Sequence, residues 1–173
     1  ARVDEVLSVA RERTIPDPVV FDPEEVLFEV IDEWGPRYES SGLGLAAELD
    51  PTDMVSGDPS ALRDAVSCLL DNALKYRREN RDDAKVWLVL AQDGQKVRIE
   101  VADNGLGVPK AMRKSIFERF VRVEGPNRGK AGGHGLGLHQ VQEIVKAHRG
   151  QILCTEGIDG GTRFTIQLPA VRS

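Results

Sequence analysis

The chain has 173 residues, enough for one domain with a substantial hydrophobic core. Its formal net charge of -5 argues against a nucleic-acid partner, and an aromatic content of only 5% argues against a base-stacking surface. No apolar run approaches the roughly 20 residues that a membrane-spanning helix needs.

The first residues, ARVDEVLSVARER, are charged throughout, so we expect no signal peptide in them, and they lack an initiator methionine. They also have a helical stripe of apolar residues. We therefore expect a cytoplasmic piece of a longer protein, whose remaining part can still carry a membrane anchor. The two cysteines, Cys68 and Cys154, lie far apart and form no Cys-x-x-Cys motif, so we expect reduced thiols.

The prolines of TIPDPVVFDP predict a linker that leads into a short strand at residues 19–21. Asp22 can cap a following helix and Pro23 fits its first turn, whereas Pro36 is expected to end or kink that helix. The alternation in GLGLAAEL predicts a strand.

Asp58 and Pro59 repeat the helix-start signal before the long amphipathic segment SALRDAVSCLLDNALKYRREN. Two β-rich runs joined by Asp93-Gly94 predict a hairpin, and PKAMRKSIFERF predicts a short helix. A last helix ending near His148 and a final pair of strands complete the chain. This order predicts an α/β (α+β) two-layer sandwich, with a mixed, mostly antiparallel sheet covered by helices on one face.

The segment AGGHGLGLHQVQEIVKAH, which starts at Ala131, places four glycines just before a predicted helix. It matches neither a P-loop nor the dinucleotide-binding fingerprint. The free N–H groups of a helix start attract anions, so the glycines suit a phosphate. A loop followed by a close-packed helix start explains them equally well.

Two other stretches carry polar groups that suit a nucleotide. DNGLGVP places the Asp103 carboxylate beside two glycines, where it can accept a hydrogen bond from a ligand amine; an ordinary turn is the alternative. CLLDNALKY places an amide, an ammonium and a phenol on one helix stripe, which suit Mg²⁺, a phosphate and a base respectively. A solvated helix face is the alternative there. The stripe consists of Cys68, Asn72, Lys75 and Tyr76.

Taken in order, CLLDNALKY, DNGLGVP, IFERFVRV, GGHGLGL and GTRFTIQLP resemble five motifs of the catalytic, ATP-binding domain of bacterial sensor histidine kinases. These are the N box, the first glycine box, the F box, the second glycine box and a terminal glycine–threonine element. The family belongs to the GHKL group and has the Bergerat ATP-binding fold. The resemblance implies a bundle-helix tail and linker at residues 1–17, and a catalytic domain at 18–173 with a lid at about 108–134.

The resemblance also implies a role for each motif residue, with ATP and Mg²⁺ as the ligands. Asn72, Lys75 and Arg122 would serve phosphoryl transfer, Asn72 as the Mg²⁺ ligand. Phe117 and Phe120 would anchor the lid. The nucleotide would contact Tyr76, Asp103, Gly105, Gly107 and Thr162 on its adenine side, and Gly133, His134, Gly135, Leu136, Gly137 and Leu138 along its phosphates, with Val108 and Phe120 as further contacts.

Two features depart from the family pattern. Cys68 replaces the usual first asparagine of the N box, and a thiol is a poor Mg²⁺ ligand. Gyrase-like relatives have a water-activating glutamate there, so its absence favours transfer to a protein acceptor. None of His134, His139 and His148 matches the phosphoacceptor position, and for His148 we expect a packing or capping role.

We therefore predict a histidine-kinase ATP domain whose acceptor histidine lies on the dimerisation bundle of the same parent protein. A response regulator would be the next partner, with no nucleic acid and no direct membrane contact. Two alternatives stay open: a pseudokinase in which nucleotide only shifts conformation, which Cys68 keeps in play, and a protein-serine kinase of the anti-sigma type. The proline-broken first helix favours the histidine kinase over the latter.

Overall fold

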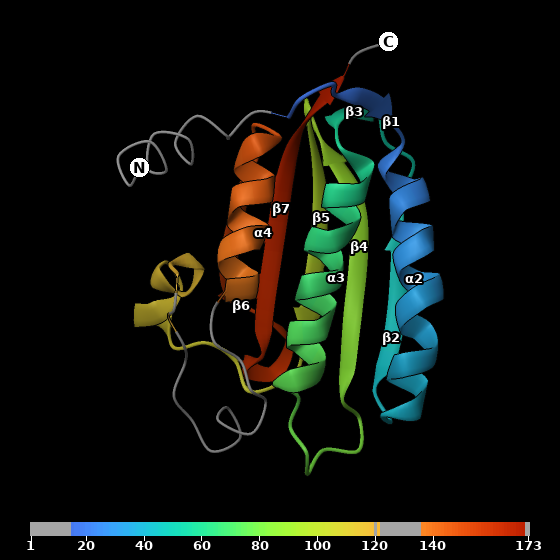
Figure 1. The fold of residues 1–173 in the computed structure, drawn as a ribbon. Coiled ribbons are helices and arrows are strands. Elements are labelled where there is room, and N and C mark those ends of the chain that lie inside the picture. Colours follow the sequence, from blue (N-terminus) through green and yellow to red (C-terminus); the bar gives the residue numbers. More distant parts are fainter. Residues whose placement is uncertain (1–14, 120, 122–135, 172–173) are drawn as a thin grey trace.

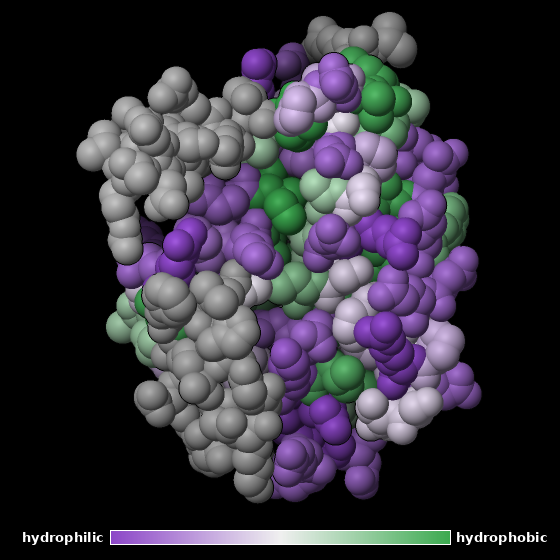
Figure 2. Space-filling view, in the orientation of Figure 1, coloured by the Kyte–Doolittle hydropathy of each residue, from purple (hydrophilic) through white to green (hydrophobic). Residues whose placement is uncertain are grey.

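The computed structural model describes residues 15–119, 121 and 136–171. One seven-stranded sheet lies behind the helices α2 (Pro23–Ser40), α3 (Pro59–Lys75) and α4 (Leu136–Ala147), which cover one of its faces (Figure 1). The outer surface over α2 is mainly hydrophilic (Figure 2). This arrangement confirms the predicted two-layer fold. The predicted helix at residues 1–13 and most of the predicted lid lie outside the described residues.

The sheet has the order β1-β3-β7-β5-β4-β2, and β6 pairs with β7 on the side where β3 also lies. β2 runs parallel to β4, and the other pairs are antiparallel. The sheet is therefore mixed and mostly antiparallel, as predicted. The strands are β1 (Val19–Phe21), β2 (Gly44–Leu49), β3 (Met54–Gly57), β4 (Lys85–Asp93), β5 (Lys96–Asp103), β6 (Gln151–Glu156) and β7 (Thr162–Val171).

The two predicted N-caps are present. The Asp22 carboxylate accepts from Glu24 N at 2.9 Å, and the Asp58 carboxylate accepts from Ser60 N at 3.0 Å, each just before a proline in the first helical turn. The apolar stripe of α3 packs into the core. The buried residues of that stripe are Leu62, Ala65, Val66, Leu69, Leu70 and Ala73.

Helix α2 does not end at Pro36 but continues to Ser40. A proline inside a helix removes one hydrogen bond and clashes with the preceding turn. Here Trp34 and Tyr38 on either side are buried and pack edge to face, and the Tyr38 hydroxyl donates to Leu70 O at 2.7 Å. These contacts hold the last turn in helical form, so tertiary packing outweighs the local cost of the proline.

Three other elements differ from the sequence-based expectations. β3, which was not predicted, pairs with β1 and β7. The short helix expected from PKAMRKSIFERF is instead two 3-10 turns, η1 (Lys110–Met112) and η2 (Ser115–Phe117). Helix α3 ends at Lys75, so the arginines that follow lie in a loop. A further 3-10 turn, η3 (Ile158–Gly160), joins β6 to β7.

Within the described ranges, no helix is both long and apolar enough to cross a bilayer.

Candidate functional site

Three of the predicted motifs meet at one end of the sheet. Asp103 ends β5, Thr162 begins the neighbouring strand β7, and the C-terminal end of α3 lies beside the turn that follows Asp103. Asp103 Oδ1 accepts from Thr162 N at 3.1 Å, and Leu106 N donates to Tyr76 O at 3.0 Å. Segments separated by more than 80 residues therefore form one site.

The Asp103 carboxylate is buried, with 8% of its surface exposed. Its Oδ1 also accepts from Gly105 N at 2.8 Å, so two backbone N–H groups fix its orientation. A buried carboxylate is costly unless such donors satisfy it, and an ionised carboxylate has about four acceptor sites in total. Asp103 is therefore a rigidly held acceptor at the mouth of three converging segments.

Gly105 and Gly107 allow these segments to approach closely. A Cβ atom at Gly105 would lie 2.7 Å from Tyr76 O, and one at Gly107 would lie 2.2 Å from Gly160 O. Gly107 also has a φ of +77°, in the left-handed region that favours glycine. The two glycines thus have a structural role in the contact between the loops.

The polar stripe of α3 is only partly solvated. Lys75 is exposed and pairs with Asp71 at 3.1 Å, four residues earlier on the helix. The Asn72 side chain is half-buried and has no hydrogen-bond partner among the described residues. Tyr76 caps the helix, its N–H donating to Asn72 O at 3.0 Å. The helical spacing of these residues correctly predicted that they share one face. It did not predict the ion pair between Lys75 and Asp71.

Cys68 joins this stripe to the start of α4. A Cβ atom at Gly137 would lie 2.8 Å from the Cys68 Sγ, so the two helices are in close contact at this point. Burial raises the pKa of the Cys68 thiol to about 11; the Asp71 carboxylate adds to the shift and the Lys75 ammonium opposes it. Cys68 is therefore a neutral thiol near pH 7, and Gly137 fits the close-packed helix start that the sequence left as an alternative.

The remaining predicted residues divide into two groups. Val108 and Leu138 are half-buried and pack against the hydrophobic core, and Phe117 is buried against Phe164 with ring centroids 6.0 Å apart. His139 Nδ1 lies 3.3 Å from Phe117 O, which links α4 to η2. Residues outside the described part of the chain are Phe120, Arg122, Gly133, His134 and Gly135, together with the Leu136 side chain.

Sequence reasoning missed several polar residues around Asp103. The Asn104 side chain accepts from Lys85 N and donates to Asp83 O, each at 2.9 Å, and so fixes the end of β5 against the start of β4. Arg78 contacts the turn after β5 and the turn between β6 and β7, and Arg81 contacts the second of these turns. The run of mixed charges in RRENRDD was the available signal, but charged runs are usually solvated surface.

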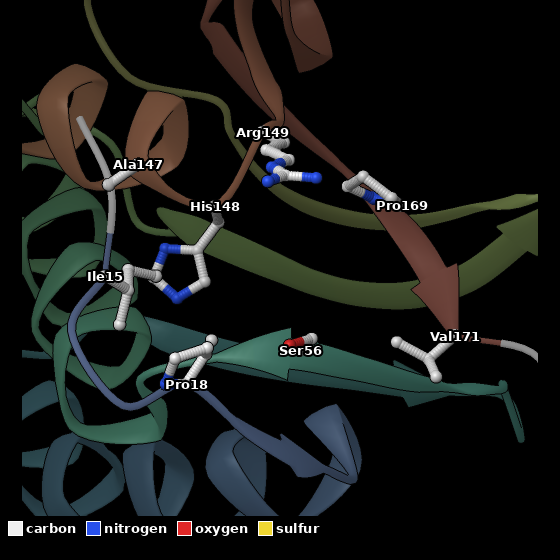
Figure 3. Close-up of a pocket in the computed structure, with 9 residues that line it drawn as sticks. Ile15, Pro18, Ser56, Ala147, His148, Arg149, Pro169 and Val171 are labelled. Atoms are coloured by element: carbon white, nitrogen blue, oxygen red, sulfur yellow. The ribbon is translucent and has the colours of Figure 1, made fainter.

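A cavity of about 350 Å³ lies at the opposite end of the sheet (Figure 3). The β5–β7 register places Pro169, which lines it, opposite Lys96 at the start of β5, far from Asp103 at its end. The His148 ring faces this cavity. Its Nε2 accepts from Asp58 N at 3.0 Å and its Nδ1 lies 2.8 Å from Ile144 O, so it bonds the end of α4 to the cap of α3. His148 therefore has the packing role expected from the sequence.

Comparison with known proteins gives matches to a single domain family. A family profile described as "Histidine kinase-, DNA gyrase B-, and HSP90-like ATPase" matches residues 57–172. The "Adaptive-response sensory kinase SasA" of Synechococcus sp. (strain JA-2-3B'a(2-13)) is 36% identical over 146 residues, which are 83% of this chain and 37% of that protein. The chain spans about a third of the length of the curated relatives that it matches.

Two solved structures are similar over nearly the whole chain. The "Mycobacterial sensor histidine kinase MprB" has 30% identity and a TM-score of 0.70, and covers 92% of this chain and 100% of its own. Full-length ShkA in complex with AMPPNP has 28% identity and a TM-score of 0.77, and the match covers 99% of this chain and 35% of that one.

Proposed function

Because this chain belongs to the histidine kinase-, DNA gyrase B- and HSP90-like ATPase family and is the ATP-binding catalytic domain of a two-component histidine kinase, we propose that it transfers the γ-phosphoryl group of ATP to a histidine. That histidine would lie on a dimerisation bundle of the same parent protein, from which a response regulator would receive the phosphoryl group. We further propose that residues 1–17 are the tail of that bundle and its linker, and that the domain itself begins at residue 18.

The observation that carries this proposal is the buried Asp103 carboxylate, held by Gly105 N and Thr162 N beside the end of α3. An acceptor fixed in this way suits the exocyclic amine of adenine and rejects a base that presents a carbonyl oxygen there. The Tyr76 ring, at the end of α3, would line the base. The adenine side of the site would thus be preformed.

The phosphate side would use the same helix. Asn72 offers a hard amide oxygen with no hydrogen-bond partner among the described residues, and such an oxygen fits Mg²⁺. When bound, Mg²⁺ would neutralise charge on the phosphates; the other ligands would come from ATP and water. Lys75 would reach a phosphate oxygen once it exchanges its exposed ion pair with Asp71, which costs little.

Phosphoryl transfer requires mainly positioning and positive charge from the protein. The close contact between Cys68 and Gly137 would bring the start of α4 next to Asn72, so that helix N–H groups face the phosphates. The roles of Phe120, Arg122, Gly133, His134, Gly135 and Leu136 stay predictions.

The acceptor histidine would come from outside the described residues, because His139 and His148 are both engaged in packing contacts. Transfer of labelled phosphate from ATP to a separately supplied acceptor bundle tests this directly. Mg²⁺-dependent labelling of the bundle, absent when its histidine is replaced, is the expected result. ATP binding without transfer in any condition would favour a nucleotide-sensing pseudokinase.

Cys68 is the observation that favours this second candidate. A neutral thiol near Asn72 cannot supply the second oxygen ligand that an asparagine would. Cys68→Asn separates the two functions: a gain in transfer rate identifies a weakened kinase, whereas unchanged binding with no transfer identifies a sensor. Transfer to a serine of a partner protein, with none to histidine, would instead identify a kinase of the anti-sigma type.

A further inference from the structure

Two arginines in the loop after α3 contact both loops that surround Asp103. Arg78 Nε donates to Gly105 O at 2.9 Å, and its Nη2 lies 3.4 Å from Asp159 O. Arg81 Nη2 donates to the Asp159 carboxylate at 2.7 Å. The arginines therefore connect three segments: the end of α3, the turn after β5 and the turn between β6 and β7.

The turn between β6 and β7 lies directly against Asp103. A Cβ atom at Gly161 would lie 2.0 Å from Asp103 O, and Thr162, the next residue, donates its N–H to the Asp103 carboxylate. Any shift of this turn therefore moves one of the two donors that orient the carboxylate. The conformation of the turn is coupled to the geometry of the candidate site.

The turn, GIDGG, is closed by two backbone hydrogen bonds, from Gly157 N to Gly161 O and from Gly161 N to Ile158 O, each at 2.9 Å, but its three glycines leave the backbone many alternative conformations. Asp159 has φ 50° and ψ 41°, a left-handed conformation that a residue with a side chain adopts only at some cost. Its carboxylate is held by Arg81, and its carbonyl oxygen lies beside Arg78. The arginines thus add side-chain contacts that favour this one conformation of the turn.

Arg81 is itself held in place. Its Nε donates to the Asp83 carboxylate at 2.5 Å, and only 20% of its side chain is exposed. Both carboxylate partners are largely exposed, and ion pairs with exposed partners contribute little to overall stability. We therefore expect the ion pairs of Arg81 to affect the geometry of the site more than the stability of the fold.

We propose that Arg78 and Arg81 are positioning residues for the base of the bound nucleotide, acting by holding the two loops around Asp103 in register. The inference rests on the proposed nucleotide site but concerns residues that none of the family motifs contains. It assigns part of the base affinity and base selectivity to two side chains that do not themselves touch the ligand.

The test compares the affinity for ADP and GDP, by calorimetry with Mg²⁺, of the whole chain and of Arg78→Ala, Arg81→Gln and Asp159→Asn. The matched control is Arg63→Gln. Arg63 also bridges two carboxylates, Glu29 at 3.4 Å and Glu33 at 3.2 Å, but between α2 and the first half of α3.

We expect the ADP affinity to fall about tenfold in Arg78→Ala, which loses a charged donor to a backbone carbonyl, and about threefold in Arg81→Gln, which loses a more exposed pair. The preference for ADP over GDP should fall in parallel, whereas the control should match the parent. The double variant Arg81→Gln/Asp159→Asn should bind no more weakly than the weaker single variant, because both remove the same contact.

Melting temperatures without nucleotide separate positioning from folding. Variants with a lower melting temperature but with the ADP affinity and base preference of the parent would overturn the inference and leave the proposed function intact. A parent chain that binds neither nucleotide would remove the proposed function and this inference with it. If Arg78→Ala does not fold, Arg78→Lys, which keeps the charge but lacks the Nε donor, takes its place with the same expected result.

Discussion

Replacing Asp103 with asparagine should strongly weaken ATP binding while the fold is kept. Asparagine has nearly the same shape, and its carbonyl oxygen can accept from Gly105 N and Thr162 N as Asp103 Oδ1 does, at 2.8 and 3.1 Å. With the carbonyl oxygen held there, the amide NH₂ occupies the position of the second carboxylate oxygen. Two donors, this NH₂ and the adenine amine, then face each other.

The magnitude follows from the bond that is lost. A hydrogen bond to a charged group contributes about 1.5–3 kcal/mol, and a mismatch of two donors removes all of it, so we expect ATP affinity to fall about 10-fold to 150-fold. Stability should change much less. The two backbone bonds become neutral and not charge-assisted, a loss of about 1 kcal/mol in the free energy of unfolding.

Calorimetry with ATP and Mg²⁺ measures the first quantity and thermal unfolding without nucleotide the second. The matched control is Asp93→Asn, because Asp93 is also a hydrogen-bonded carboxylate at the end of a strand, but its partner is the Arg98 side chain at 2.7 Å and it lies in the hairpin turn at the other end of β5. Binding of ATP by Asp103→Asn within about threefold of the parent would refute the reasoning, since the buried carboxylate then contributes no hydrogen bond to the ligand.

Three further predictions concern packing and ionisation. Gly107→Ala should lower the free energy of unfolding by about 2–4 kcal/mol, because a Cβ at positive φ meets a backbone oxygen at 2.2 Å. Gly35→Ala, inside α2, should change the free energy of unfolding by less than about 1 kcal/mol, because the gain in helix propensity is opposed by the following Pro36; equal denaturation midpoints for the two variants would contradict the reasoning. Tyr38→Phe should lower the free energy of unfolding by about 1 kcal/mol and the melting temperature by about 2–4 °C, because it removes a buried hydroxyl that donates to an α3 carbonyl at 2.7 Å. No change in melting temperature would show that water replaces this bond. Alkylation of Cys68 by iodoacetamide should be slow at pH 7, and its rate should rise about tenfold per pH unit up to the thiol pKa of about 11. Cys154, whose pKa is raised to about 12 by burial, should react more slowly still. A Cys68 rate that levels off near pH 8 would contradict the raised pKa.

Local signals determined much of the fold. The caps at Asp22 and Asp58, each followed by proline, and the Asp93-Gly94 turn appear in the structure where the sequence predicted them. These signals act over two to four residues, so no knowledge of the rest of the chain is needed to recognise them. The grouping of Asn72 and Tyr76 on one stripe of α3 likewise follows from helical periodicity alone.

Tertiary packing decided what local signals could not. Pro36 stays within α2 because the buried side chains of Trp34 and Tyr38 anchor the turn around it. Strand β3 is too short to be recognised by alternation, and it forms because β1 and β7 offer partners on both sides.

The site shows the same division. The sequence proposed Asp103 as an acceptor, but only the structure shows that a donor 59 residues away orients it. It also shows that Arg78, near the start of the polar run RRENRDD, reaches Asp159 across 81 residues. The partners of a polar side chain are set by how the strands and helices pack, and neither propensity nor periodicity carries that information.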